Sequence, residues 1–282
     1  MTSVPKKQNA WQKLPPERRR KILIVLGAVA GAAVLVWALD LFLHEETDDA
    51  YVTGHVHYVS ARISGTVQEV KVDDNELVQE GQELVKIDPA EYDATLRQRK
   101  GEEERARLNF ERDKSLLEGE AVSKEEWEQD KSTLETAQAQ LTWAQLQKDY
   151  TTVRAPASGR VGRKNVEVGL HIEAGQTLLA VVEPDLWVVA NFKETQLAHM
   201  RAGQKVKMTI DAIPGHTFTG VVDSFSPASG NQFALLPADN STGNFTKIVQ
   251  RVPVKIRFDA ESTKGYEDRL RAGLSVIVKV RT

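Results

Sequence analysis

The stretch SGTVQEVKVDDNELVQEG at residues 64–81 decides the fold, because a second stretch, SGRVGRKNVEVGLHIEAG at residues 158–175, repeats its outline. Each stretch begins with Ser-Gly and ends sixteen residues after that first glycine on a second one, Gly81 or Gly175. Apolar and polar residues alternate in both, as in short β-strands. A unit of about thirty residues cannot bury a core alone, so we expect the two copies to pair into one β-sandwich.

The segment between the two copies, residues 89–149, has a different composition. It is rich in Glu, Lys, Arg, Gln, Ala and Leu and has no proline after Pro89, which predicts helix. Asp88 supplies an N-cap at its start, and Ser123, three residues before a glutamate, begins a capping box. Between them Gly119 stops the first helix. The segment therefore predicts two helices that meet at a tight turn.

Apolar residues in both predicted helices recur at heptad-like spacing in a narrow stripe. Such a stripe favours an antiparallel two-helix coiled coil whose surface lies mostly in water or against further copies of the chain. A solvated helical spacer without a partner is the alternative. At 1.5 Å per residue the first helix would project roughly 43 Å. The stripe consists of Tyr92, Leu96, Ala106, Phe110 and Leu117 in the first helix and Trp127, Leu134, Ala137, Leu141 and Ala144 in the second.

An apolar block at residues 22–43 predicts a transmembrane anchor. Its first part, ILIVLGAVAGAAVLVWAL, has no charge and would span roughly 27 Å as a helix. Lysines and arginines crowd residues 1–21, whereas acids follow the block, so the positive-inside rule puts the N-terminus in the cytoplasm and the chain after residue 43 outside. A cleaved signal peptide is the alternative.

After Pro184 the alternation of apolar and polar residues returns and predicts a β-barrel at residues 184–260, followed by one or more C-terminal strands at 261–282. The short glycine motif recurs here around Gly203 and Gly273. This recurrence indicates that the glycine motif is partly a general feature of β-turns and not only a mark of the repeat.

The composition of the chain gives no support to a reactive centre. A net charge of -3 does not favour nucleic acid as a partner, and the lack of cysteine excludes disulfides and thiolate ligands. His55 and His57 share one face of a predicted strand but lack a third ligand. Lys86 and Lys148 flank the helical insertion where a carrier domain would have its modified lysine. We expect no enzyme, metal site or cofactor.

These features resemble the membrane fusion proteins, the periplasmic adaptors of tripartite pumps, and among them the EmrA-like and haemolysin-secretion type. The resemblance covers nearly the whole chain. It is carried by EETDDAYV after the apolar block, by the two half-lipoyl repeats joined through a helical hairpin, by TTVRAPASGRV, and by NFKETQLAHMRAGQ and STGNFTKIVQRVPVKI further on.

The resemblance implies a mainly β fold with an α-helical hairpin. A transmembrane helix would precede a lipoyl-like β-sandwich, split by a two-helix coiled coil, and a β-barrel with a membrane-proximal β segment would follow. The expected parts are a basic cytoplasmic segment (1–21), the anchor (22–43), a membrane-proximal segment (44–60), lipoyl-like half 1 (61–88), the hairpin (89–149), lipoyl-like half 2 (150–183), the barrel (184–260) and the C-terminal strands (261–282).

For the hairpin tip, the resemblance implies a contact with an outer-membrane channel of the TolC type. Adaptors that meet such a channel carry an arginine, a leucine four residues on and a serine seven further, and Arg112, Leu116 and Ser123 match this spacing. The arginine can pair with carboxylates or carbonyls, the leucine can pack in a groove, and the serine caps the returning helix. The alternative is that these three residues have no partner and are simply residue types that are common at helix ends. The hairpin is short for an EmrA-like adaptor, which leaves its direct reach to the channel open.

The implied function is that of an adaptor in the inner membrane with a single transmembrane pass, a cytoplasmic N-terminus and a periplasmic bulk. It would couple an inner-membrane transporter, with the major-facilitator type favoured, to the channel for export of drugs or other small toxic compounds, and it would act as a homo-oligomer. The alternatives are an adaptor of an ABC-driven protein or peptide secretion system, an adaptor that binds only the transporter, and a carrier domain bearing lipoate or biotin. The transported substrate and the number of copies are not readable from the sequence.

Overall fold

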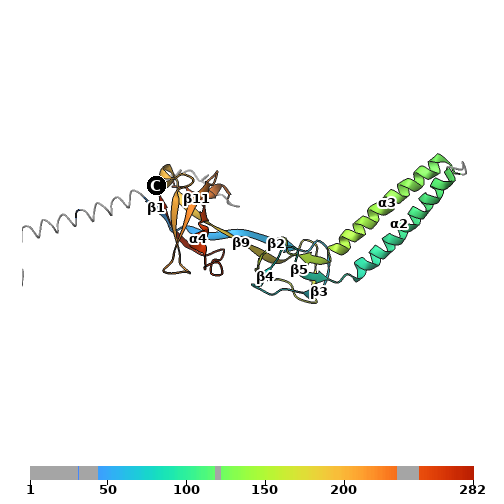
Figure 1. Ribbon diagram of the computed structural model, residues 1–282, viewed down its shortest axis with the longest axis horizontal. Helices are drawn as coiled ribbons and strands as arrows, with labels where there is room; N and C mark the ends of the chain where they lie inside the picture. The colour runs from blue at the N-terminus through green and yellow to red at the C-terminus, as the bar shows by residue number, and fades with distance from the viewer. Residues whose placement is uncertain (1–30, 32–43, 118–121, 234–247) are drawn as a thin grey trace, which may run out of the picture. The chain divides into compact units, whose positions relative to one another are not determined.

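The computed structural model describes residues 31, 44–117, 122–233 and 248–282, drawn in colour in Figure 1. These residues form two compact units, one of which combines the described chain up to Thr53 with Leu186–Thr282, while the other is Gly54–Asp185. The predicted basic segment and, apart from Gly31, the predicted anchor lie outside the described residues. Within the described ranges, no helix has both the length and the apolar character that a membrane crossing needs.

In the unit Gly54–Asp185 the two sequence repeats pair reciprocally. Strand β3 (Gly65–Val70) of the first repeat pairs antiparallel with β8 (His171–Ile172) of the second. Strand β7 (Gly159–Val161) of the second repeat pairs antiparallel with β4 (Leu77–Val78) of the first. Each repeat thus supplies a partner strand to the other, and the predicted pairing of the two copies is confirmed.

Backbone hydrogen bonds outside the strands repeat the same exchange. The N–H of Gly81 donates to the carbonyl of Ala155 at 2.9 Å, and the N–H of Gly175 donates to the carbonyl of Ala61 at 2.8 Å. Both glycines lie in the left-handed region, with φ of 79° and 89°. Side chains rarely adopt this conformation, which explains why a glycine ends each repeat.

The two layers of this β-sandwich share one apolar core. One layer is a four-stranded sheet in the order β6-β5-β3-β8, which adds β5 (Glu83–Ile87) and β6 (Thr152–Arg154). The other contains β4, β7 and the first part of β9 (Thr177–Lys193). Apolar side chains from both repeats fill the space between the layers. Fully buried members of this core are Val67, Leu84, Ile87, Val161, Ile172, Leu178 and Val181.

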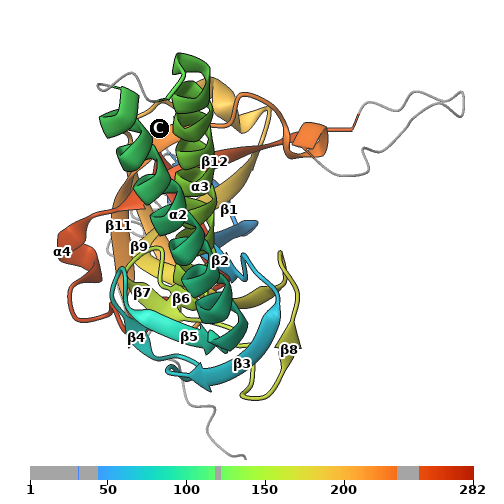
Figure 2. The same ribbon diagram turned by 90° about the vertical axis from the view of Figure 1, so that its right-hand side faces the viewer.

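The helical hairpin leaves and re-enters the β-sandwich at one place. Its helices are α2 (Ala90–Leu117) and α3 (Lys124–Asp149), which lie antiparallel and side by side in Figures 1 and 2. Asp88 caps α2 as predicted, since its carboxylate accepts from the N–H of Ala90 at 3.0 Å. At the base, the N–H of Ile87 donates to the carbonyl of Thr151 at 2.8 Å and so joins the two ends.

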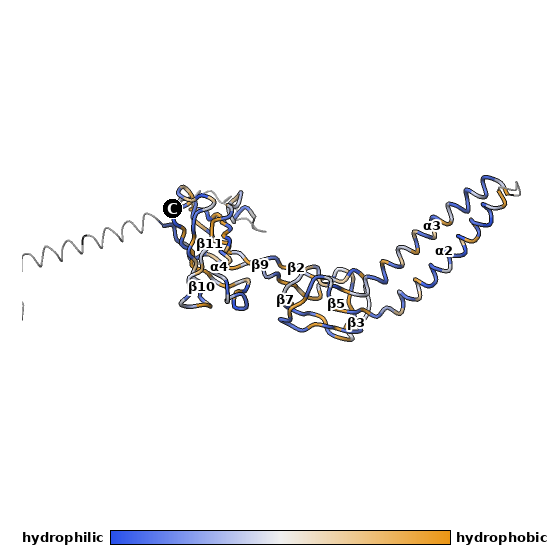
Figure 3. The backbone as a smooth tube through the Cα atoms, in the orientation of Figure 1, coloured by the Kyte–Doolittle hydropathy of each residue, from blue (hydrophilic) through white to orange (hydrophobic). Residues whose placement is uncertain are grey.

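The interface between α2 and α3 is narrow, as the sequence predicts. Its best-buried apolar residues are small: Ala106, Ala137 and Ala144 are 7%, 8% and 3% exposed. Figure 3 shows that most residues of both helices are hydrophilic. At the base of the hairpin Lys148 pairs with Asp93 at 2.7 Å. The hairpin is therefore held by a thin apolar seam supplemented by charges.

The other unit is a β-barrel around a separate core. Its strands follow the order β1-β13-β10-β11-β12-β9. Buried side chains alternate with more exposed ones along β10 and β13, as expected when one face is in a core. The strands are β1 (His44–Thr47), β10 (Lys205–Ile210), β11 (Thr217–Phe225), β12 (Arg251–Phe258) and β13 (Val276–Arg281), and the short helices are η2 (Gln196–His199), η3 (Gly230–Phe233) and α4 (Ala260–Thr263). Fully buried core residues include Val188, Phe192, Met208, Ile210, Phe218, Ile256 and Val278.

The barrel closes through the start of β2 (Ala50–Ser60). On one side the N–H of Asn191 in β9 donates to the carbonyl of Asp49 at 2.8 Å. On the other side the N–H of Val52 donates to the carbonyl of Leu274 at 2.9 Å. Because β1 pairs with β13, part of the stretch 44–60, for which we expected a separate membrane-proximal segment, contributes to the barrel.

Pro184, at which we expected the barrel to begin, lies inside a strand and next to the division between the two units after Asp185. Strand β9 runs through this residue without a break. A proline lacks the N–H that would bond a neighbouring strand, and it is tolerated where that bond is not needed. The boundary between the two units therefore falls within a continuous strand.

Candidate functional site: the hairpin tip

The candidate site lies where α2 ends and α3 begins. Arg112 and Leu116 belong to the last turns of α2, and Ser123 directly precedes α3. Residues 118–121 between them are not described. The three predicted site residues therefore lie at the same end of the hairpin, on both sides of the turn.

Arg112 presents its guanidinium to solvent and contacts two neighbours on its own helix. Its side chain is 63% exposed, and its Nη2 donates to Oδ1 of Asn109 at 2.6 Å. Its Nε lies 3.6 Å from Oδ1 of Asp113. A guanidinium has five N–H donors in a rigid fork, so these contacts leave donors free for a carboxylate or carbonyl on another molecule.

Leu116 lies on the same side of α2 as Arg112, because residues four apart in a helix share a face. It is 39% exposed, so part of its apolar surface is open to solvent. Between the two, the hydroxyl of Ser115 donates to the carbonyl of Arg112 at 2.6 Å. The last turns of α2 thus present a cation and an apolar side chain next to each other.

Ser123 is the N-cap of α3, as the sequence predicts. Its backbone is extended, with φ of -73° and ψ of 151°. Its hydroxyl oxygen accepts from the N–H of Glu126 at 3.2 Å. A cap of this kind satisfies one of the N–H groups that the first helical turn leaves without a partner.

An aromatic contact holds the two helices together just below the tip. The ring centroids of Phe110 in α2 and Trp127 in α3 are 5.8 Å apart, and the ammonium of Lys131 lies 5.9 Å from the Trp127 ring centroid. Within α3, the backbone N–H of Trp127 donates to the carbonyl of Ser123 at 3.2 Å. The start of α3 is therefore fixed to α2 through Trp127.

Sequence reasoning missed two residues that orient Arg112, namely Asn109 and Asp113. The side chain of Asp113 is only 13% exposed and occupies a seam position seven residues after the buried Ala106. A carboxylate is expensive at such a position unless it is paired. The signal that could have found it is a charged residue at an expected apolar position, directly beside the tip arginine.

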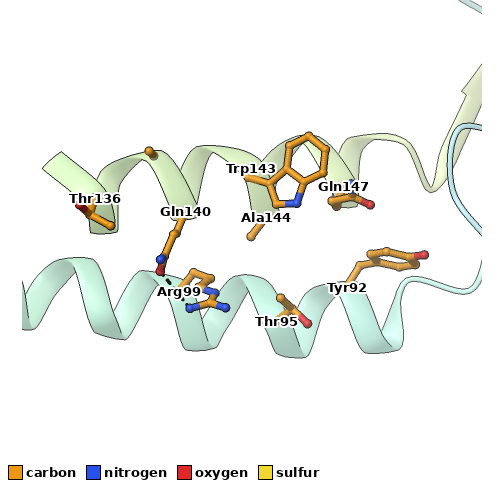
Figure 4. A pocket seen from close by; sticks show the side chains of 9 residues that line it. Tyr92, Thr95, Arg99, Thr136, Gln140, Trp143, Ala144 and Gln147 are labelled. Carbon is orange, nitrogen blue, oxygen red and sulfur yellow. Dashed lines mark hydrogen bonds between the residues drawn. The ribbon is translucent and has the colours of Figure 1, made fainter. Parts of the chain in front are cut away.

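A groove lies between α2 and α3, nearer the base of the hairpin (Figure 4). It has a volume of about 520 Å³. The guanidinium of Arg99 donates to Oε1 of Gln140 at 2.9 Å across it, and Trp143 at its rim is 61% exposed. Burial raises the pKa of Tyr92, which also lines the groove. Tyr92 and Arg99 are the titratable residues among those that line the groove.

The residues considered for metal or cofactor chemistry are engaged elsewhere. Nε2 of His57 lies 2.6 Å from Oε1 of Glu183, and the His55 and His57 ring centroids are 6.5 Å apart. Among the described residues no group of three histidine, aspartate or glutamate side chains could hold a metal ion. Of the two candidate carrier lysines, Lys86 lies in β5 opposite Thr152, and Lys148 pairs with Asp93.

Comparisons with known proteins agree with this architecture. Residues 55–183 match the barrel-sandwich hybrid domain of RND membrane fusion proteins, and residues 185–232 match a CusB-like β-barrel domain. The colistin resistance protein EmrA of Acinetobacter baumannii is 32% identical, with 92% of this chain and 92% of that protein covered. The multidrug export protein EmrA of Haemophilus influenzae is 32% identical, with coverage of 99% and 87%.

Among solved structures, a MacA–MexA chimera that contains the α-hairpin domain of Pseudomonas aeruginosa MexA has the same fold. It superimposes with a TM-score of 0.69 at 21% identity, and covers 82% of this chain and 79% of the chimera. The alignments with the two EmrA proteins extend over 329 and 345 positions, more than the 282 residues of this chain. Both relatives therefore have residues with no counterpart here.

Proposed function

Because the chain belongs to the membrane fusion proteins, and within them to the EmrA-like adaptors, we propose that it couples an inner-membrane transporter to an outer-membrane channel of the TolC type. Residues 22–43 anchor it in the inner membrane with the N-terminus in the cytoplasm, and the two described units lie in the periplasm. The exported compounds are drugs or other small toxic molecules, in keeping with the names of the relatives. Several copies act together.

The observation that carries this proposal is the exposed, oriented guanidinium of Arg112 at the tip. Asn109 holds it at 2.6 Å, and Leu116 exposes apolar surface four residues away. Arginine is one of the residue types enriched in interaction hot spots, and the adjacent apolar surface could be covered by a partner.

The proposal is tested by the charge reversal Arg112→Asp in a Gram-negative host that lacks its own adaptors and expresses the transporter encoded beside this chain. We expect loss of resistance to the exported compounds with unchanged amounts of adaptor in the membrane. The matched control is Arg97→Asp, which reverses an exposed charge on α2 far from the tip and should leave resistance intact. Unchanged resistance in Arg112→Asp would refute docking through the tip.

An adaptor that binds only the transporter is the second candidate, and the length of the hairpin favours it. Helix α2 has 28 residues, or about 42 Å, and the EmrA relatives are longer than this chain. Because the chain has no cysteine, a single cysteine in place of Ser115 gives a unique crosslinking site near the tip. An adduct with the channel supports direct docking, whereas adducts confined to further copies of the chain support the second candidate.

The nature of the transporter separates two further alternatives. A major-facilitator transporter beside this chain fits drug export, whereas an ATP-binding cassette would indicate protein or peptide secretion. The carrier-domain alternative predicts a lipoyl or biotinyl group on Lys86 or Lys148. The intact mass of the purified chain decides that question, since either group adds a defined mass.

A further inference from the structure

One face of the barrel carries a concentration of positive charge. Along β10 the side chains of Lys205, Lys207 and Thr209 are exposed, while those between them are buried in the core. On the neighbouring β13, Arg281 is exposed and Lys279 is 39% exposed on the same side. We call Lys205, Lys207, Lys279 and Arg281 the basic face; Figure 3 labels β10 at this part of the barrel.

The register of the strands places these cations directly against one another. Lys207 lies opposite Lys279 in the β10–β13 pair, and the same register brings Lys205 level with Arg281. Like charges at directly opposite positions destabilise a sheet. On β1, which pairs with the other edge of β13, the carboxylate of Glu46 lies 3.4 Å from the Lys279 ammonium. Within the part of the chain that the structure describes, Lys205 and Lys207 make no ion pair, so the basic face has four cations and one acid.

The basic face lies beside the point where the chain enters the barrel from the predicted anchor. His44, the first residue of β1, directly follows residue 43 and lies opposite Arg281. The sheet order β1-β13-β10 then puts the cations of β13 and β10 about 5 and 10 Å from β1, at about 4.8 Å between neighbouring strands. A chain anchored through residues 22–43 would hold this face near the membrane surface.

We propose that the basic face binds the headgroups of anionic phospholipids in the membrane that holds the anchor. Lysine and arginine donate charge-assisted hydrogen bonds to phosphate oxygens, and the hydroxyl of Thr219, opposite Lys207, adds a neutral donor. The anionic headgroups screen the repulsion between Lys207 and Lys279. The proposal rests on the anchor in the proposed function but needs neither transporter nor channel.

The composition of the face favours lipid over an acidic protein as the partner. On β1, β10 and β13, Ile277 is the one large apolar side chain among the described residues that is strongly exposed, at 40%. Protein interfaces are built around a buried apolar or aromatic centre, which these strands do not supply. Lysines and arginines clustered near a membrane surface, in contrast, are attracted to anionic lipid headgroups by charge alone.

The test uses the full chain, reconstituted through its anchor into nanodiscs of phosphatidylcholine alone or with phosphatidylglycerol. An amine-reactive reagent followed by mass spectrometry then reports the labelling rate of each lysine. We expect Lys205 and Lys207 to react about fivefold more slowly in the anionic discs, and the protection to vanish at high salt. Lys124 at the far end of α3, whose side chain is 80% exposed, should react equally in both and serves as the internal control.

The variant Lys207→Glu separates lipid binding from a structural role. It places an acid opposite Lys279, which should raise the melting temperature of the chain. The same variant should reduce the protection of Lys205 in anionic discs, whereas the matched reversal Lys100→Glu on the hairpin should change neither quantity. Equal labelling of Lys205 and Lys207 in both kinds of disc overturns the proposal, and protection that requires a co-reconstituted transporter overturns it in favour of a protein partner. Either result leaves the Arg112 test of the adaptor function intact.

Discussion

Replacement of Ser123 by alanine should loosen the start of α3 and so weaken the hairpin tip. The hydroxyl of Ser123 accepts from the N–H of Glu126 at 3.2 Å, and alanine offers no acceptor. Loss of an N-cap serine costs about 1 kcal/mol. Because Ser123 is exposed, little packing is lost with the hydroxyl, and the effect should stay local to the first turn of α3.

The assay is amide hydrogen exchange on the full chain. A cost of about 1 kcal/mol corresponds to a roughly fivefold faster exchange at Glu126. The matched control is Ser132→Ala in the middle of α3, which should leave exchange at the tip unchanged. An unchanged exchange rate at Glu126 in Ser123→Ala would show that the cap does not hold the helix start.

A second variant distinguishes the cap from a direct contact with the channel. Aspartate caps helices about as well as serine, so Ser123→Asp should restore slow exchange at Glu126. If Ser123 acts through the cap, Ser123→Asp retains drug resistance while Ser123→Ala loses part of it. If the hydroxyl itself contacts the channel, both variants lose resistance although only one loses the cap.

Three further expectations follow from the geometry. In Gly220→Ala the new methyl carbon would lie 2.2 Å from the carbonyl oxygen of Arg257, so the barrel should lose about 1–3 kcal/mol in thermal unfolding. In contrast, Gly101→Ala in α2 meets nothing within 4 Å and should stabilise the helix by about 0.5–1 kcal/mol in the same measurement; a loss would contradict the helix assignment. Finally, a hydrogen bond from Lys71 lowers the pKa of Glu83, so the stability that this carboxylate contributes is present above its unfolded pKa and is lost as the pH falls through the lower folded value. Melting temperatures between pH 6 and pH 3 should therefore fall less steeply in Glu83→Gln, and identical slopes would contradict the pairing.

The arrangement of the β-sandwich was predictable because its signal is local and occurs twice. The sixteen-residue offset between the glycines of each repeat fixes the distance between two strands and a turn, and the turn requires the left-handed conformation seen at Gly81 and Gly175. The ends of the hairpin were predictable for the same reason, since Asp88 and Ser123 act within three residues of their own positions.

The closure of the barrel was not predictable from pattern alone. Strand β1 pairs with β13 at the other end of the chain, with His44 opposite Arg281, and no periodicity links two such distant segments. The positioning of Arg112 was missed for another reason. Asn109 and Asp113 look like ordinary helix residues in sequence, and only the placement of α2 against α3 shows that Asp113 lies in the seam.

The backbone hydrogen bond between Ile87 and Thr151 closes the base of the hairpin. The length of the hairpin can therefore change without changing the stability of the β-sandwich. Helix α2 begins and α3 ends beside this bond, so residues can be added to or removed from the two helices in matched sets of seven without altering the registers of the strands below. Each set changes the span of the hairpin by about 10 Å and keeps the seam residues facing each other. The distance that the hairpin spans can thus be adjusted in steps by evolution or design, while the β-sandwich at its base stays the same.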